Sequence, residues 1–327
     1  MRSPIVMAGL VVALAASGLM LEGYTLRVLT LALINVIAVL GLNLAYGYCG
    51  VIHLGQAAFA GLGAYATALL TTKLGWPIWL TIPTALLTST AIAVLISVPL
   101  VRLKGHYLAL ATVGINVIFE LIAKNWIEVT NGYNGVTGIP RLGEMMSATS
   151  PDQMFYLLAA TITLLAAWAA LRLRRSHLGR AMIALRDDEI AAVTAGIDPR
   201  RTQVIAFALS GFFAAVAGVL YAHYIGFISP TDFAVAQSIL YLAMLVVGGE
   251  GAVAGAIIGA LILTFLPEAL RDAATAFVAA GGDEKSLIAR LLKDGYLAIY
   301  GLITLLVLTL MPTGLIGLAK RRGMRTP

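Results

Sequence analysis

The sequence predicts an all-α fold, a polytopic transmembrane helical bundle of about ten spans with both termini cytoplasmic. Of its 327 residues, 60% are hydrophobic and only 12% are charged, whereas ordinary soluble domains carry about 25% charged residues. The apolar residues form continuous runs of about 20, which is the length a helix needs to cross the hydrocarbon core. They do not alternate with polar residues as in the strands of a membrane β-barrel. The 33 glycines follow no three-residue repeat and suit closely packed membrane helices.

We expect each long apolar run to form one membrane-spanning helix, because only helices and closed barrels satisfy every backbone group in lipid. The runs lie near residues 4–21, 28–46, 53–72, 78–101, 105–124, 155–172, 204–223, 234–248, 252–270 and 296–313. No Pro-rich or Ser-rich linker separates them. Residues 1–327 are therefore expected to form a single membrane domain.

The first run also fits a signal peptide, with Arg2 as its charged start and residues 13–15 as a small-residue cleavage site. However, the apolar run over residues 5–21 is longer than the about 7–15 residues usual for such a segment. We therefore expect a retained helix.

Basic residues cluster in alternate connections, and short loops rich in Lys and Arg stay on the cytoplasmic side. The connection around residues 125–153 holds only Arg141 as a basic residue, and residues 271–294 mix both signs of charge. These two segments are expected outside. The residues expected inside are Arg2, Arg102, Lys104, Arg172, Arg174, Arg175, Arg180, Arg186, Arg200, Arg201, Lys320, Arg321, Arg322 and Arg325.

The sequence lacks the usual motifs for binding a metal, forming a disulfide or binding a nucleotide. Cys49 is the only cysteine, and the four histidines never stand in an HExxH spacing. No lysine ends a GxxxxGK[ST] string. We expect no metal site and no cofactor in this chain and do not expect an enzyme, so any ATP-driven work must be powered by a partner.

The first irregular segment is residues 47–65, in which glycines surround His53 and Gln56. One reading is a turn and a small-residue packing helix with both polar side chains hydrogen-bonded inside the bundle. The other is that the segment lines a translocation pathway, because polar side chains at membrane depth usually face a cavity. The pathway candidates are His53, Gln56 and Phe59, and the glycines expected to have structural roles here are Gly47, Gly50 and Gly55.

A second Gly-rich stretch covers residues 248–260. Gly251, Gly255 and Gly259 recur every four residues, which would place all three on one face of a helix for close packing. Glu250 is expected at a cytoplasmic turn.

The loop over residues 131–140, NGYNGVTGIP, is rich in Asn, Gly and Pro. These residues favour tight turns over a helix. The loop is either a plain connector or part of an external docking surface or gate.

Residues 176–201 are too polar to span the membrane, yet their apolar residues recur at helical spacing. We expect one amphipathic cytoplasmic helix over about 178–195, ended by Gly196. Asp198 and Pro199 would then cap and begin the next helix. A helix lying on lipid headgroups is the alternative, but the acidic residues 187–189 favour a protein partner over anionic lipid.

Four strings occur in order along the chain: GLNLAYGYCGVIHLGQAAFAGLGAY, NGYNGVTGIP, GRAMIALRDDEIAAVTAGIDPRRTQVIAFALSGFFAAVAGVLYA and VVGGEGAVAGAIIGA. Together they resemble the permease subunits of branched-chain amino acid ABC importers of the LivH/LivM type, over residues from about 28 to 313. The TGIP ending at Pro140 looks more like the M-type subunit than its H-type partner.

The resemblance implies a multi-pass protein of the bacterial inner membrane that imports branched-chain or related amino acids by alternating access. It implies four kinds of partner: the lipid bilayer, a second homologous permease, two cytoplasmic ATPases that use ATP and Mg, and an extracytoplasmic substrate-binding protein. No nucleic acid is expected. Related permeases also serve urea and aromatic acids, so the solute class stays open.

Residues 189–196 resemble the ATPase-contacting loop of that family, although Ile190 interrupts the contiguous Glu-Ala-Ala of the older importer signature. The expected ATPase-docking residues are Ile183, Arg186, Glu189, Ile190, Ala192, Val193 and Gly196.

Three other classes compete with a permease of this kind. An ion-coupled secondary transporter would need a carboxylate or a broken-helix ion site near the midplane, whereas Glu120 and Glu268 lie near predicted helix ends. An intramembrane enzyme would need a nucleophile beside its base, but Ser210 and His223 are thirteen residues apart in one predicted helix. A receptor or scaffold would leave the cytoplasmic helix without a specific partner.

Overall fold

The computed structural model describes residues 23–103, 105–146, 150–279, 301–302 and 314–315. Their elements are α2 (Gly23–Leu42), the π-helix η1 (Asn43–Tyr48), α3 (Gln56–Thr72), α4 (Ile78–Leu100), α5 (His106–Asn125), α6 (Ile127–Thr130), the 3₁₀-helix η2 (Gly132–Asn134), β1 (Val136–Thr137), α7 (Leu142–Met146), α8 (Pro151–Arg175), α9 (His177–Asp187), α10 (Glu189–Thr194), α11 (Pro199–Ile225), β2 (Phe227–Ile228), the 3₁₀-helix η3 (Pro230–Phe233), α12 (Val235–Gly248) and α13 (Val253–Ala279).

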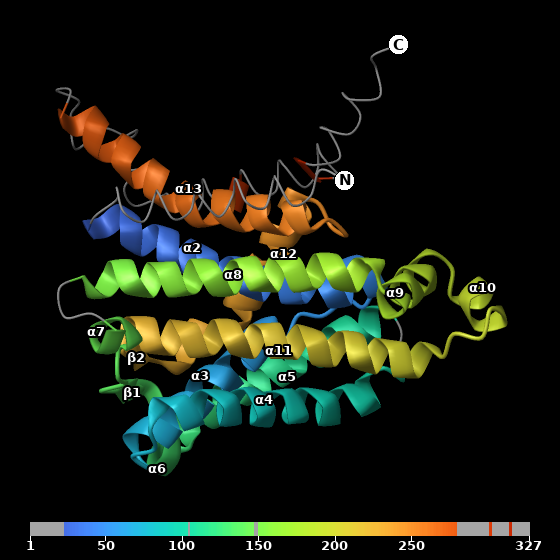
Figure 1. Ribbon diagram of the computed structural model, residues 1–327, viewed down its shortest axis with the longest axis horizontal. Coiled ribbons are helices and arrows are strands. Elements are labelled where there is room, and N and C mark those ends of the chain that lie inside the picture. Colours follow the sequence, from blue (N-terminus) through green and yellow to red (C-terminus); the bar gives the residue numbers. More distant parts are fainter. Residues whose placement is uncertain (1–22, 104, 147–149, 280–300, 303–313, 316–327) are drawn as a thin grey trace.

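The long helices run along one common direction and form a bundle with two distinct ends (Figure 1). Helices α9 and α10 project from one end, which we call the α9 end, and β1, β2, α6 and α7 cover the other, which we call the β end. Among the described residues, six helices are long and apolar enough to cross a membrane. The all-α polytopic fold is therefore confirmed.

Eight of the expected spans correspond to described helices, although α13 continues to Ala279, nine residues past its expected end at residue 270. The expected spans 4–21 and 296–313 lie outside the described residues. Helices α3 and α12 have 17 and 14 residues, and at about 1.5 Å per residue both are shorter than the hydrocarbon is thick. Helix α3 follows the irregular residues 50–55, and α12 follows the 3₁₀-helix η3.

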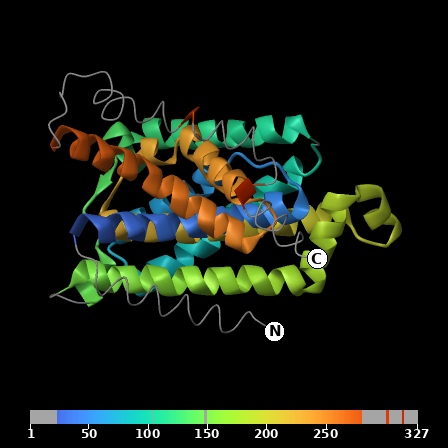
Figure 2. The same ribbon diagram turned by 90° about the horizontal axis from the view of Figure 1, so that it is seen from above.

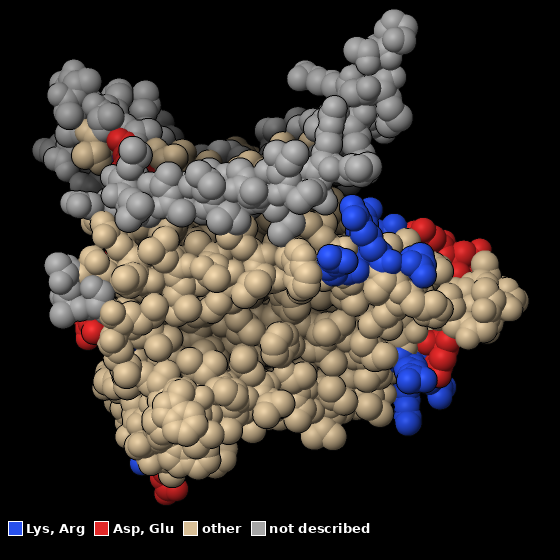
Figure 3. Space-filling view, in the orientation of Figure 1, with Lys and Arg blue, Asp and Glu red and all other residues tan. Residues whose placement is uncertain are grey.

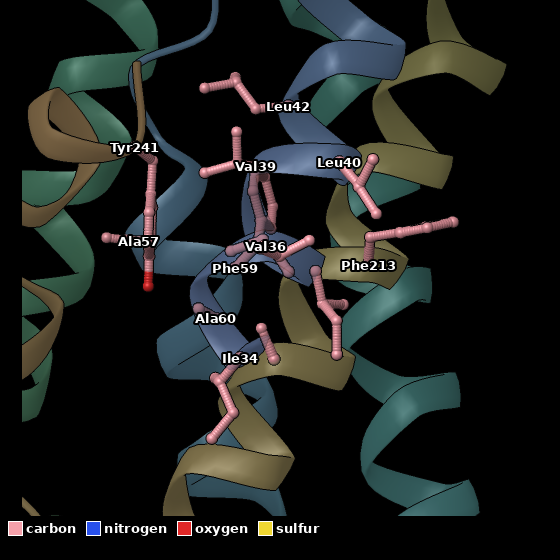
Figure 4. Packing of buried hydrophobic residues seen from close by; sticks show 14 of the residues in the cluster. Ile34, Val36, Val39, Leu40, Leu42, Ala57, Phe59, Ala60, Phe213 and Tyr241 are labelled. Carbon is pink, nitrogen blue, oxygen red and sulfur yellow. The ribbon is translucent and has the colours of Figure 1, made fainter. Parts of the chain in front are cut away.

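Helix α2 is the centre of the bundle. It packs against α8, α11, α12 and α13. Most of the apolar segment formed by α2 and η1 is buried, whereas most of α5 is not. Figure 4 shows side chains from α2, α3, α11 and α12 gathered into one core, including Val36, Phe59, Phe213 and Tyr241. Figure 2 shows α13 crossing obliquely over α2.

Small residues bring neighbouring helices into backbone contact, as is common in membrane bundles. A Cβ at Gly218 of α11 would overlap the carbonyl of Ala60 in α3. Gly255 and Gly259 meet the backbone of α12 in the same way, as expected. Gly251 does not share their helix face, because α13 begins only at Val253 and Gly251 lies in the preceding turn with φ +73°.

The loop at the β end folds by turns, as its composition predicts, but it also contributes an unpredicted strand. β1 pairs antiparallel with β2, with Val136 opposite Ile228, and the backbone N–H of Ile139 donates to the carbonyl of Gly226 (3.2 Å). The described part of the outer loop is thereby held against the end of α11.

On the face shown in Figure 3, the charged side chains lie at the two ends of the bundle. Figure 3 shows a wide band without Lys, Arg, Asp or Glu along the bundle and basic side chains gathered at the α9 end. The elements that meet there contribute Arg172, Arg174, Arg175, Arg180, Arg186, Arg200 and Arg201. This distribution agrees with the predicted grouping of basic connections on one side of the membrane.

Candidate functional site

Helix α3 begins inside the protein, so its first backbone N–H groups need partners that water would otherwise supply. The chain leaves η1 at Cys49, continues without regular structure through residues 50–55, and enters α3 at Gln56. The hydroxyl of Ser238 in α12 accepts from the N–H of Ala57 (2.8 Å), and the side-chain oxygen of Asn116 in α5 accepts from that of Ala58 (3.0 Å).

Asn116 joins the starts of both short helices. Its side-chain oxygen also accepts from the Ser238 hydroxyl (2.9 Å), and its Nδ2 donates to the carbonyl of Phe233 (3.0 Å), just before α12. All its side-chain contacts are with buried groups, and the residue itself is fully buried. One amide therefore fixes α3, α5 and α12 relative to one another at a place where the backbone is irregular.

The pathway candidates His53, Gln56 and Phe59 lie close together in the same region and are buried. Gln56 donates to the carbonyl of Ala38 (2.7 Å) and accepts from the Ser210 hydroxyl (2.9 Å). The His53 ring stacks on Phe207, with centroids 4.3 Å apart, and packs edge-on against Phe59. Its Nδ1 accepts from the N–H of Gly55 (3.1 Å), whereas its buried Nε2 has no hydrogen-bond partner.

A cavity of about 820 Å³ lies beside this region, between α2, α11, η3 and α12. Leu31, Ile34 and Leu240 give it apolar walls, and Asp232 and Gln237 give it polar groups. His53, Gln56 and Phe59 are not among the residues that line it. The structure therefore brings the three candidates together without exposing them to this cavity.

Two carboxylates of the spanning helices are paired: Glu120 lies near the end of α5, as expected, whereas Glu268 lies within α13, which continues to Ala279. Glu120 binds Lys124 on the next turn of α5, and Glu268 accepts a hydrogen bond from the Tyr24 hydroxyl. Within the described residues, no group of His, Cys, Asp and Glu could hold a metal ion.

Ser210 and His223 have separate partners. Ser210 bonds to Gln56, whereas the His223 ring lies 2.9 Å from the Thr67 hydroxyl and 2.8 Å from the carbonyl of Pro140. The two side chains do not form a nucleophile and base, as their separation in the sequence predicted.

The expected single helix over 178–195 is two helices. Asp188 breaks it, because its extended backbone (φ −157°, ψ 107°) ends α9 and its carboxylate accepts from the N–H groups of Ile190 and Ala191 as the N-cap of α10. Aspartate is strongly preferred at such a position. Gly196 follows α10 with φ +83°, and Asp198 caps α11 ahead of Pro199, both as predicted.

The two helices, which we call the α9–α10 element, bury one set of apolar side chains and expose another. Met182, Leu185 and Ala192 are buried against the bundle, and Ile183 is partly buried. Ile190 is 79% exposed and Val193 is 50% exposed. Neither is expected to lie in hydrocarbon, because α10 extends beyond the charged end of the bundle (Figures 1 and 3).

Arg186 was expected among the docking residues, but part of its guanidinium points into the protein. Its Nη1 donates to the carbonyl of Gly47 in η1 (2.6 Å), and its Nε and Nη2 donate to Asp187 (3.1 and 2.9 Å). Gly47 and Gly50 lie near this contact, whereas Gly55 packs against the backbone of α5 at Thr112.

Sequence reasoning missed the buried polar residues that connect the helices, namely Asn43, Thr112, Asn116 and Ser238. Asn43 and Asn116 could have been noticed as amides within strongly apolar runs, because polar residues at membrane depth usually need partners. Their partners could not have been identified, since Asn116 and Ser238 are 122 residues apart.

A bundle of long apolar helices with buried polar contacts and a projecting element at its charged end defines a multi-pass membrane protein. The family described as "Branched-chain amino acid transport system / permease component" matches residues 24–310. The chain belongs to this family of inner-membrane transport permeases, whose members are not themselves enzymes.

Individual relatives agree with this assignment. The chain is 35% identical over 294 residues to the high-affinity branched-chain amino acid transport system permease protein LivM of Escherichia coli, covering 83% of this chain and 69% of that protein. It is 26% identical over 299 residues to LivH of the same species, covering 85% and 89%. It is 27% identical over 255 residues to the ribose import permease protein RbsC of Haemophilus influenzae, covering 75% and 76%. No solved structure matches the chain.

Proposed function

We propose that this chain is the LivM-like permease subunit of an importer for branched-chain or related amino acids. The observation that carries the proposal is the family match, together with an exposed apolar helix at the charged end of the bundle. Partner ATPases hydrolyse ATP with Mg and drive alternating access. A second homologous permease completes the pathway, and an extracytoplasmic binding protein delivers the solute. The resemblance of the Asn131–Pro140 loop and the way it is held at the β end support that end as the delivery side.

Uptake by a reconstituted complex tests this function. Proteoliposomes with this chain, a second permease and an ATPase should take up leucine, isoleucine or valine only with ATP inside and loaded binding protein outside. The chain alone should neither bind nor hydrolyse ATP. Uptake driven by an ion gradient with this chain alone would contradict the proposal, and uptake of ribose or urea in place of these amino acids would contradict the solute class.

The proposed topology has ten spans and both termini in the cytoplasm, with the α9 end inside. The basic residues at that end support it. In a Cys49→Ser background, Thr137→Cys should react with an impermeant maleimide in intact cells. Thr194→Cys should react only after the membrane is opened. Labelling of position 194 in intact cells would reverse the orientation.

The α9–α10 element is proposed to bind the ATPase through its exposed apolar side chains. Burying a side chain such as Ile190 is worth roughly 1.5–3 kcal/mol, whereas an exposed ionic contact from Glu189 is worth about 0.2–1 kcal/mol. Ile190→Asp should therefore weaken ATPase co-purification and abolish uptake, and Glu189→Gln should be milder. Thr194→Asp is the control for the added charge, because Thr194 lies in α10 together with Ile190.

Residues 47–65 are proposed to border the translocation pathway in another state of the transport cycle. The unpartnered Nε2 of buried His53 and the irregular backbone before α3 support this idea, because polar groups and broken helices at membrane depth usually line a cavity. His53→Cys should become accessible to a small thiol reagent during ATP-driven turnover and stay unreactive at rest. Protection in both conditions would leave His53 with a packing role only.

A further inference from the structure

We propose that Arg186 is the positioning residue that connects the α9–α10 element to the membrane bundle, by holding the carbonyl of Gly47 in a slot beside Gly50 and Gly251. The proposal rests on the proposed function of α10 as the ATPase contact. It assigns Arg186 a role inside this chain in place of the direct ATPase contact expected from the sequence.

The guanidinium is fixed on two sides. Nη1 binds the Gly47 carbonyl, and Nε with Nη2 holds Asp187, the next residue of α9. Gly47 belongs to the last turn of η1, where backbone carbonyls lack partners within the helix and carry partial negative charge. A charge-assisted hydrogen bond to such a carbonyl is about twice as strong as a neutral one.

Gly50 and Gly251 make room for this contact, and Gly47 provides its carbonyl. A Cβ at Gly50 would lie 3.0 Å from Cγ of Arg186, and one at Gly251 would lie 2.9 Å from its Nη1. A Cβ at Gly47 would overlap the side chain of Asn43. Gly50 and Gly251 also have positive φ values of +70° and +73°. The slot therefore has to be free of side chains for the guanidinium to reach its acceptor.

A second hydrogen bond extends the connection to the turn between α12 and α13. The buried side chain of Asn43 in η1 accepts from the N–H of Gly251 (2.9 Å). Arg186 thus meets η1 at the point where η1 also holds the α12–α13 turn. Because η1 continues directly from the enclosed helix α2, a displacement of α9 would reach the centre of the bundle.

The local structure leaves room for such a displacement. A cavity of about 480 Å³ beside the slot is lined by Cys49, Gly50, Arg102, Leu185, Arg186 and Arg200, among others. η1 is a π-helix, a conformation that is rare and often found at functional sites. The contact between α9 and η1 therefore borders a cavity and is not surrounded by close packing on that side.

The test separates binding of the ATPase from coupling to it. Arg186→Gln should keep ATPase co-purification within about twofold of wild type, retain ATP hydrolysis and lower uptake about tenfold, the effect of losing one hydrogen bond to a charged group. Arg186→Lys, which keeps one donor and the charge, should restore part of the uptake. Arg180→Gln is the matched control, because Arg180 lies on the same helix and, among the described residues, donates to the nearby carbonyl of Arg175.

A second variant tests the slot without changing Arg186. Gly50→Asn should lower uptake as Arg186→Gln does, because asparagine tolerates positive φ but its side chain would meet Arg186. Gly75→Asn is its control, since Gly75 has φ +63° with no atom within 4 Å of an added Cβ.

The outcomes are distinguishable. Loss of ATPase co-purification in Arg186→Gln, to the extent seen in Ile190→Asp, would make Arg186 part of the binding surface and overturn the proposal. Normal uptake in both Arg186→Gln and Gly50→Asn would also overturn it. Normal co-purification of the ATPase with Ile190→Asp would overturn the proposed function of α10 itself. Because this result comes from a substitution at residue 190, it is distinct from failure of the Arg186 proposal.

Discussion

His223 binds the carbonyl of Pro140 through its ring, with Nδ1 2.8 Å from the oxygen. A carbonyl only accepts, so Nδ1 carries a proton, and Nε2 lies 2.9 Å from the Thr67 hydroxyl. The imidazole, buried at the end of α11, thus joins α3 to the loop at the β end.

Replacing this ring should loosen the loop. His223→Phe leaves the Pro140 carbonyl and the Thr67 hydroxyl without this partner, which should lower the free energy of unfolding by about 1–3 kcal/mol. Thermal unfolding of the purified protein in detergent measures the loss, and faster thiol labelling of Thr137→Cys reports the loosened loop. His106→Phe, at an exposed position, should change neither quantity.

Helix contact through Gly218 gives a second prediction. Gly218→Ala places a methyl group against the Ala60 carbonyl and should cost about 1–3 kcal/mol of stability as α11 and α3 are forced apart. Gly114→Ala meets no atom within 4 Å and should be neutral or stabilising by about 0.5–1 kcal/mol, since alanine is the better helix former. Equal melting temperatures for the two variants would contradict the close contact.

The turn after α10 depends on a left-handed residue. Gly196 has φ +83° and its N–H binds the carbonyl of Val193 (3.0 Å). Gly196→Val should strain the turn, displace α10 and reduce ATPase co-purification, because β-branched residues disfavour positive φ. Gly196→Asn should be much milder. Similar losses in both variants would show that the glycine is needed for space and not for its backbone conformation.

Cys49 should be unreactive in the folded protein. It is 4% exposed, and burial raises the pKa of its thiol to about 12. The thiolate is the reactive form, so the thiol stays neutral between pH 7 and 9 and maleimide should label it only after denaturation. Thr137→Cys in a Cys49→Ser background is the exposed comparison. Rapid labelling of native Cys49 at pH 7 would show that the segment after η1 opens.

The spans could be predicted because their apolar runs reflect one strong requirement, that every buried backbone group be satisfied within its own helix. The same reasoning was wrong for residues 178–195, because the helical periodicity of the sequence continues through Asp188. In the structure the extended backbone of Asp188 ends α9 and its side chain caps α10. The same reasoning also placed Gly251 on a helix that starts two residues later. In both places a local hydrogen bond or a positive φ outweighed the periodic pattern.

The contacts that connect the helices could not be predicted, because they join distant residues. The Arg186 side chain reaches Gly47, 139 positions away, and β1 pairs with a strand that follows α11. A polar residue in an apolar run indicates that it needs a partner, but several partners are chemically equivalent. The fold decides which carbonyl or hydroxyl is within reach.

The enclosed position of α2 has a consequence for the order in which the protein is assembled. The helices that cover it, α8, α11, α12 and α13, all follow it in the chain, so α2 enters the bilayer before its cover has been synthesised. Its apolar surface is as well accommodated by lipid as by protein, and lipid offers no hydrophobic force to bury it. The later helices must therefore associate with α2 through close packing, such as that of Gly41 against Phe213 and Ser210 of α11. A bulky residue at Gly41 would leave insertion intact and trap the chain as inserted but unassembled helices.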